Sequence, residues 1–185
     1  MVHQSRNIYI DLLKGILIFL VVLGHVIQYI VYPHSSLHRS DWLWSLIYMF
    51  HMPLFIALSG YFTHFSIQKY QLKEYLAQRF RLLLVPLLIW SALTAIIIWI
   101  LGDSGEENII YSVLLSIKNS YWFVWAILFF SVLIGVLHYF KLDKAIVLIL
   151  LSFSILLPVK FYPLGIIKDM LPFFIAGYAF NRYQH

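Results

Sequence analysis

Four long stretches of the sequence contain no charged residue, and they limit what the chain can fold into more than any other feature. They cover residues 15–38, 42–68, 82–102 and 119–140, with lengths of 24, 27, 21 and 22 residues. An α-helix needs about 20 predominantly apolar residues to cross the hydrocarbon core of a bilayer. Each stretch therefore predicts a membrane-spanning helix.

Two shorter uncharged stretches follow at 145–159 and 170–181 and predict two further helices, either short or re-entrant. We therefore expect an all-α, polytopic membrane bundle of about six helices. Internal repeats are absent and linkers are short, so residues 1–185 are expected to form a single domain. The first stretch is expected to remain as a helix, because Lys14 lies among its apolar residues and no signal-peptide cleavage site follows.

The composition excludes several other classes of protein. Of all residues, 62% are hydrophobic and 11% are charged, which is too apolar for a soluble globule or a disordered chain. The sequence has no cysteine, so a disulfide-stapled scaffold is excluded. The net charge of +5 does not indicate nucleic-acid binding, because no segment interleaves dense Lys and Arg with stacking aromatic residues.

The distribution of basic residues predicts the orientation in the membrane. Six helices place both termini on one side, whose flanks hold Arg6, Lys69, Lys73, Arg79, Arg81, Lys141, Lys144 and Arg182. The other side holds only Arg39, Lys118, Lys160 and Lys168. Cytoplasmic flanks carry the excess of Lys and Arg in membrane proteins. Both termini are therefore expected in the cytoplasm, and the basic excess reflects topology.

The first predicted helix carries a stripe of polar residues. Lys14 and His25 are 11 positions apart, which corresponds to three turns plus about 20° and about 16 Å along a helix, so they share a face. Asp11 precedes Lys14 by three positions and is placed to pair with it. Gln28 follows His25 by three positions and continues the stripe. Such a stripe should face the bundle interior or a wet cavity, since lipid offers polar groups no partner.

His25 has two interpretations: a histidine that hydrogen-bonds a neighbouring helix, or a functional group. The cost of placing an ionisable side chain in a membrane favours function. An imidazole can accept a proton from an alcohol near neutral pH or carry an acyl group, so His25 is the best candidate for a general base or a relay. Lys14 taken alone is explained by snorkelling toward the headgroups.

The second predicted helix contains Pro53, which should bend it. The bend would either aim His51 into a cavity or serve packing alone, and the sequence leaves both open. Ser59 is not the nucleophile of a serine hydrolase, because Ala57 stands where the Gly-x-Ser-x-Gly motif requires glycine. We expect Ser59 at a close contact between helices.

Two clusters lie near predicted membrane surfaces. Arg79 and Arg81 would either anchor a helix against anionic lipid or clamp the phosphates of a cytosolic donor such as coenzyme A. The segment 120–125, which includes Trp122, is typical of an aromatic belt. His34 and His38 have the i, i+4 spacing of metal ligands but lack the glutamate of the zinc-protease motif, so no metal site is predicted.

Several of these segments, in this order, resemble the acyltransferase 3 family of integral membrane O-acyltransferases. They are Lys14 and His25 with ten residues between them, residues 50–62, the pair Arg79 and Arg81, residues 121–123, and residues 171–178. The resemblance covers nearly the whole chain. It implies transfer of an acetyl or short acyl group from cytosolic acetyl-CoA to a hydroxyl of a cell-surface or exported glycan, as in sugar O-acetylases of the bacterial plasma membrane.

The resemblance also implies roles for single residues. His25 would be catalytic, as a general base or an acetyl-histidine relay, with Lys14 as its basic partner. Arg79 and Arg81 would bind the phosphates of the donor. The acceptor site would be formed by four residues, namely Asp11, His51, Ser59 and Trp122.

Family domains usually have more spanning helices than the six expected here, so the chain would correspond to the N-terminal part of such a domain. A second chain or a homo-oligomer would then complete the bundle. The other partners expected are the lipid bilayer and the glycan. Two alternatives stay open from the residues alone. The polar stripe could line the pathway of a transporter or flippase half, or the chain could be a non-catalytic membrane subunit.

Overall fold

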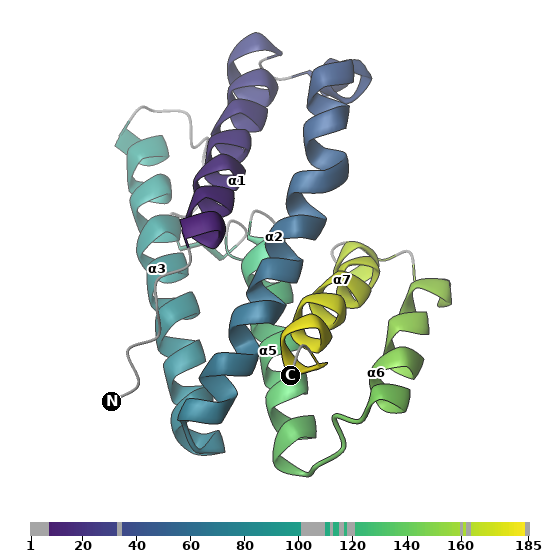
Figure 1. Ribbon diagram of the computed structural model, residues 1–185. Helices are drawn as coiled ribbons and strands as arrows, with labels where there is room; N and C mark the ends of the chain where they lie inside the picture. Colours follow the sequence, from purple (N-terminus) through teal and green to yellow (C-terminus); the bar gives the residue numbers. More distant parts are fainter. Residues whose placement is uncertain are drawn as a thin grey trace. The chain divides into compact units, whose positions relative to one another are not determined.

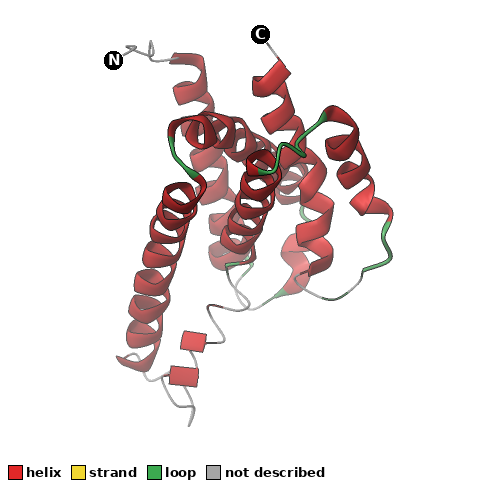
Figure 2. Cartoon of the chain, turned by 90° about the horizontal axis from the view of Figure 1, so that it is seen from below, coloured by secondary structure: helices red, strands yellow, loops and turns green. Residues whose placement is uncertain are grey.

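The computed structural model describes residues 8–32, 35–100, 110–111, 113–114, 117, 121–159, 161 and 164–183. Within these residues the chain is helical and contains no strand (Figure 2), which confirms the all-α prediction. The α-helices are α1 (Ile8–Val26), α2 (Trp42–Lys69), α3 (Leu72–Ile100), α5 (Trp122–Tyr139), α6 (Ala145–Ser152) and α7 (Leu164–Tyr183). A π-helical turn, Ile27–Val31, continues α1, and 3-10 turns cover Ser36–Ser40 and Phe153–Leu156.

Among the described residues, four helical segments are long and apolar enough to cross a membrane: Ile8–Val31, Trp42–Lys69, Leu72–Ile97 and Trp122–Tyr139. They correspond to the four long uncharged stretches, and the chain is a membrane protein. Large apolar side chains on these helices face outward, as lipid-facing residues do; Phe19 is 65% exposed, Trp90 62% and Phe129 58%. The orientation in the membrane stays a prediction, and three residues used for it, Arg6, Lys118 and Lys160, lie outside the described residues.

The chain divides into two compact units, Met1–Ile56 and Ala57–His185, with the boundary inside α2. Unit 1 contains α1, the π-helical turn and the first half of α2. Unit 2 contains the second half of α2 and the helices from α3 to α7. Each unit is described separately below, and the expectation of a single domain stays a prediction.

In unit 2, α7 packs against both α5 and α6, and α3 packs against α5 (Figure 1). The core between α5 and α7 is apolar and aromatic. Phe130 and Phe174 are 1% and 0% exposed, and their ring centroids are 5.4 Å apart. Burial of such large rings contributes much of the stability of a helical core.

The second half of α2 and α7 approach each other so closely that glycine is required on both helices. A Cβ atom on Gly60 would overlap the carbonyl oxygen of Phe174, and one on Gly177 would overlap the carbonyl oxygen of Ala57. Small residues allow such backbone contact between membrane helices. Ser59 directly precedes Gly60 on α2, and its expected place at a close contact between helices stays a prediction.

The turn between α5 and α6 is a Schellman motif. The N–H of Leu142 donates to the carbonyl of Leu137 at 2.8 Å, and the N–H of Lys141 donates to that of His138 at 2.9 Å. Lys141 has φ of 59°, the left-handed conformation that glycine usually supplies at this position. The turn reverses the chain and brings Asp143 against the end of α7.

Candidate functional site

The polar residues at the start of α1 form an ion pair. Lys14 Nζ lies 3.4 Å from Asp11 Oδ1, and the two side chains are 39% and 35% exposed. The pairing that their i, i+3 spacing predicts is confirmed. Because the carboxylate offsets the charge, the pair lowers the cost of an ammonium group below the headgroups.

His25 lies near the end of α1, two residues before the π-helical turn begins at Ile27. Its side chain is exposed within unit 1, and its ring stacks on Tyr29 with centroids 5.7 Å apart. A π-helical turn widens the helix locally and changes the direction of the side chains that follow, and such turns are frequent at functional sites. Here the π-helical turn contains Gln28 and Tyr29, which directly follow the last turn of α1, where His25 lies.

Tyr48 connects α1 with the first half of α2. Gly24 leaves space for its ring, since a Cβ atom there would lie 2.8 Å from the Tyr48 ring carbon Cε2. The Tyr48 hydroxyl donates to Oε1 of Gln28 at 3.4 Å. On its other side the ring stacks on Trp44, with centroids 4.1 Å apart. Tyr48 is thus held by residues of both helices.

His51 lies one turn beyond Tyr48 on α2, and its ring meets that of Tyr48 edge-on at 4.7 Å. The side chain is 1% exposed, and Nδ1 lies 2.6 Å from the carbonyl oxygen of Ile47. Since a carbonyl can only accept, Nδ1 carries the proton, and the neutral ring keeps its lone pair on Nε2. The backbone therefore fixes both the orientation and the tautomer of His51.

Tyr48 links the two helices that carry the histidines of the prediction. Gly24, next to His25, packs against the Tyr48 ring, and His51 meets the same ring edge-on. One imidazole is exposed, and the other is buried with its tautomer set by Ile47. We call this group, which consists of His25, Gln28, Tyr48 and His51, the histidine cluster. The cluster contains two imidazoles, which can accept a proton, and one phenol, which can donate one. Groups of these kinds are used in general acid–base catalysis.

Arg79 and Arg81, in unit 2, point to different faces of α3, as residues two apart on a helix must. The guanidinium carbon Cζ of Arg79 lies 5.1 Å from the centroid of the Tyr75 ring. Its Nε and Nη2 atoms are buried and have no hydrogen-bond partner among the described residues. Arg81 is exposed. The structure therefore does not combine the two residues into a single clamp.

Two predicted acceptor-site residues, Ser59 and Trp122, also belong to unit 2. Ser59 is partly buried and directly precedes Gly60 of α2. Trp122 begins α5, is partly buried, and meets the ring of Phe123 edge-on at 6.0 Å. Asp11 and His51 belong to unit 1, so the four residues assigned to the acceptor are divided between the two units.

Sequence reasoning missed Tyr48 and Trp44. Their positions contain a usable signal, because Trp44, Tyr48 and His51 follow one another at intervals of four and three residues and so share a face of α2. It also missed a buried ionic cluster around Asp143 in unit 2, which joins His138, Tyr178 and Arg182.

Helices long and apolar enough to span a bilayer, the first two of which share the histidine cluster, are those of an integral membrane protein. A family model described as an acyltransferase domain matches residues 7–185, and the chain belongs to this family, acyltransferase 3.

Two curated relatives cover 97% of the chain. Nodulation protein NolL of Sinorhizobium fredii is 34% identical over 182 residues, and Nodulation protein NolL of Mesorhizobium japonicum is 30% identical over 186 residues. The matches cover 50% and 49% of those proteins, so the chain spans about half the length of the curated relatives it matches. No solved structure matches the chain.

Proposed function

We propose that this chain forms part of a membrane O-acyltransferase that moves an acetyl or short acyl group from cytosolic acyl-CoA to a hydroxyl of a cell-surface or exported glycan. The observation that carries the proposal is the match to the acyltransferase family over residues 7–185. The histidine cluster supports it, because acyl transfer to an alcohol needs a base near neutral pH.

In the proposed reaction His25 is the general base. It accepts the proton of the sugar hydroxyl while the hydroxyl oxygen forms a bond to the carbonyl carbon of the thioester. The carbon–sulfur bond then breaks, and the proton passes from His25 to the departing thiolate of coenzyme A. The exposure of His25 within unit 1 suits a group that must meet two substrates.

His51 and Tyr48 act as positioning residues in this proposal. His51 cannot rotate freely, because Ile47 holds its Nδ1 proton. In this proposal its Nε2 accepts a hydrogen bond from a neutral His25 and so orients that ring. Preorganised hydrogen bonds of this kind lower the barrier without rearrangement during the reaction.

Acetyl-CoA is the proposed donor, and it would bind on the cytoplasmic side. The buried nitrogen atoms of Arg79 support an anion there, because buried donors without partners are rare in folded proteins and an anionic group would satisfy them. The proposed location is the plasma membrane of a bacterial cell. A second chain or another copy would complete the bundle around the acceptor.

The test is a transfer assay in membranes that contain the full-length protein. Acetyl-CoA with a labelled acetyl group is supplied with a panel of glycans, and label in the glycan is measured against membranes without the protein. We expect glycan-dependent incorporation with release of one coenzyme A for each acetyl group. Glycan movement across the membrane without consumption of acetyl-CoA would contradict the proposal and indicate a transporter.

A further inference from the structure

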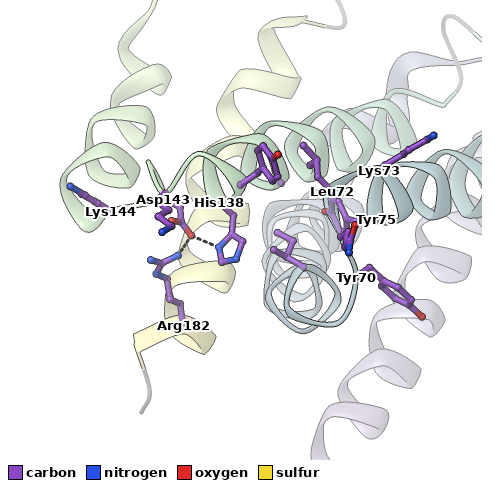
Figure 3. A pocket seen from close by; sticks show the side chains of 13 residues that line it. Tyr70, Leu72, Lys73, Tyr75, His138, Asp143, Lys144 and Arg182 are labelled. Atoms are coloured by element: carbon purple, nitrogen blue, oxygen red, sulfur yellow. Dashed lines mark hydrogen bonds and ion pairs between the residues drawn. The ribbon is translucent and has the colours of Figure 1, made fainter.

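Unit 2 contains a pocket of about 930 Å³ between the turn that joins α2 to α3, the turn that joins α5 to α6, and the end of α7 (Figure 3). This volume is within the range of small-molecule sites, roughly 300–1,000 Å³. The basic residues that line it are Lys73, Lys141, Lys144 and Arg182. All four belong to the flanks that the sequence places in the cytoplasm.

The pocket carries net positive charge. Asp143 is its one carboxylate among the described residues that line it, and this carboxylate is already neutralised. Asp143 is 2% exposed and pairs with Arg182, while the Tyr178 hydroxyl donates to its Oδ2 at 2.6 Å and His138 Nδ1 lies 2.7 Å away. Figure 3 shows His138 and Arg182 both pointing toward Asp143. Lys73, Lys141 and Lys144 are exposed and form no ion pair with another of the described residues, so their charges can attract an anionic ligand.

Lys141 gives independent support, because it occupies a conformation that costs a lysine energy. Its φ of 59° lies in the left-handed region, and glycine would fill the same place in the Schellman motif without strain. Strained residues of this kind concentrate at ligand sites. Here the strain comes with an ammonium group at the edge of the pocket.

Aromatic rings supply the other half of the site. Tyr70, Tyr75 and Tyr139 line the pocket together with the lysines. Tyr75 is 1% exposed and forms the wall of the pocket, because the guanidinium of Arg79 lies over its ring and Gly135 packs against it. Tyr139, which is 61% exposed, and the partly exposed Tyr70 are the rings that a base can reach. Base stacking on aromatic side chains is a common way to bind a nucleotide.

We propose that this pocket binds the phosphates and the purine of a nucleotide, and that its ligand is the phosphoadenosine end of coenzyme A. The lysines would contact the phosphates, and a tyrosine ring would stack on the base. This assignment rests on the proposed function. It differs from the clamp of Arg79 and Arg81, because the phosphates are placed on Lys73, Lys141 and Lys144. An anionic lipid headgroup shares the phosphate chemistry but has no base to stack.

The experiment measures direct binding to the full-length protein in neutral detergent by calorimetry. The probes are coenzyme A, dephospho-coenzyme A, inorganic pyrophosphate and nanodisc lipid containing phosphatidylglycerol as a competitor. The test variant combines Lys141→Gly with Lys144→Gln. The matched control is Lys69→Gln, which removes an exposed lysine next to the pocket that does not line it. A second variant, Tyr139→Leu, tests whether the Tyr139 ring stacks on the purine of the nucleotide.

We expect the double variant to bind coenzyme A at least about tenfold more weakly, and the control to stay within about twofold of the wild type. Tyr139→Leu should lower the affinity for coenzyme A but leave the affinity for pyrophosphate unchanged. Unchanged affinity in the double variant would overturn the proposal, and so would displacement of coenzyme A by phosphatidylglycerol together with equal binding of pyrophosphate. Absence of binding by the wild type would also overturn it.

Binding and transfer separate this inference from the proposed function. If the wild type binds coenzyme A through the lysines but transfers no acetyl group, the pocket assignment holds and the proposed function fails. If the wild type transfers acetyl groups and the double variant binds coenzyme A normally, the proposed function holds and the pocket assignment fails.

Discussion

Gly177 of α7 lies directly against the carbonyl group of Ala57 in α2, with no room between them for a methyl group. One turn earlier on α7, the carbonyl of Phe174 lies in the same way against Gly60. These residues belong to the two segments 50–62 and 171–178 that carry much of the family resemblance. The structural role that these residues share is to let α2 and α7 pack backbone to backbone in unit 2.

Gly177→Ala is expected to destabilise the protein by roughly 1–3 kcal/mol, because the added methyl group forces α2 and α7 apart. The measurement is thermal unfolding in detergent, followed by intrinsic fluorescence. Gly15→Ala is the control, since nothing lies within 4 Å of a Cβ atom there. An unfolding temperature for Gly177→Ala equal to that of the control would show that the helices do not pack as described.

Asp143→Asn is expected to lower the free energy of unfolding by about 3 kcal/mol, because it leaves Arg182 without its buried counter-charge. Asp169→Asn is the matched control. Asp169 pairs with Lys168 at 2.6 Å but is 46% exposed, so its loss should cost about 0–1 kcal/mol. Chemical denaturation of both variants gives the comparison, and equal stability of the two would refute a structural role for the Asp143 cluster.

Lys141→Gly alone is expected to raise the unfolding temperature while it weakens binding of coenzyme A. Relief of the left-handed conformation stabilises the fold by about 1 kcal/mol, whereas loss of the ammonium group removes a phosphate contact. Stability and affinity should therefore move in opposite directions. A variant that loses stability would show that Lys141 is retained for the fold and not for a ligand.

Tyr48→Phe is expected to slow acyl transfer several-fold with a loss of stability of about 1 kcal/mol or less. The variant removes the hydroxyl that donates to Gln28 but keeps the ring between Trp44 and His51. Initial rates of transfer and thermal unfolding are measured on the same preparation. Unchanged rates would mean that the phenol only packs.

The sequence predicts the spanning helices well, because bilayer thickness sets their length and lipid excludes charge from them. It predicts the start of α3 less well. The helix begins at Leu72, ten residues before the uncharged stretch 82–102, since a helix continues into the headgroup region where Lys73, Glu74, Arg79 and Arg81 are tolerated.

Local spacing also explains which parts of the site were predictable. Asp11 and Lys14 are three residues apart on one helix, so their pairing follows from helical geometry. The cluster of Asp143 with Tyr178 does not, because the two residues are 35 positions apart and meet only through the packing of α5, α6 and α7. The tautomer of His51 likewise depends on the rotamer that places Nδ1 on the Ile47 carbonyl.

The most direct test of the central claim is the rate of acetyl transfer by His25→Ala. A general base contributes roughly 10²–10⁴-fold to a rate, so transfer should fall by at least about 100-fold at saturating acetyl-CoA. His38→Ala is the control, because it removes a histidine of the same unit from the 3-10 turn Ser36–Ser40. We expect the control to retain activity; wild-type rates for His25→Ala in folded protein would contradict the account.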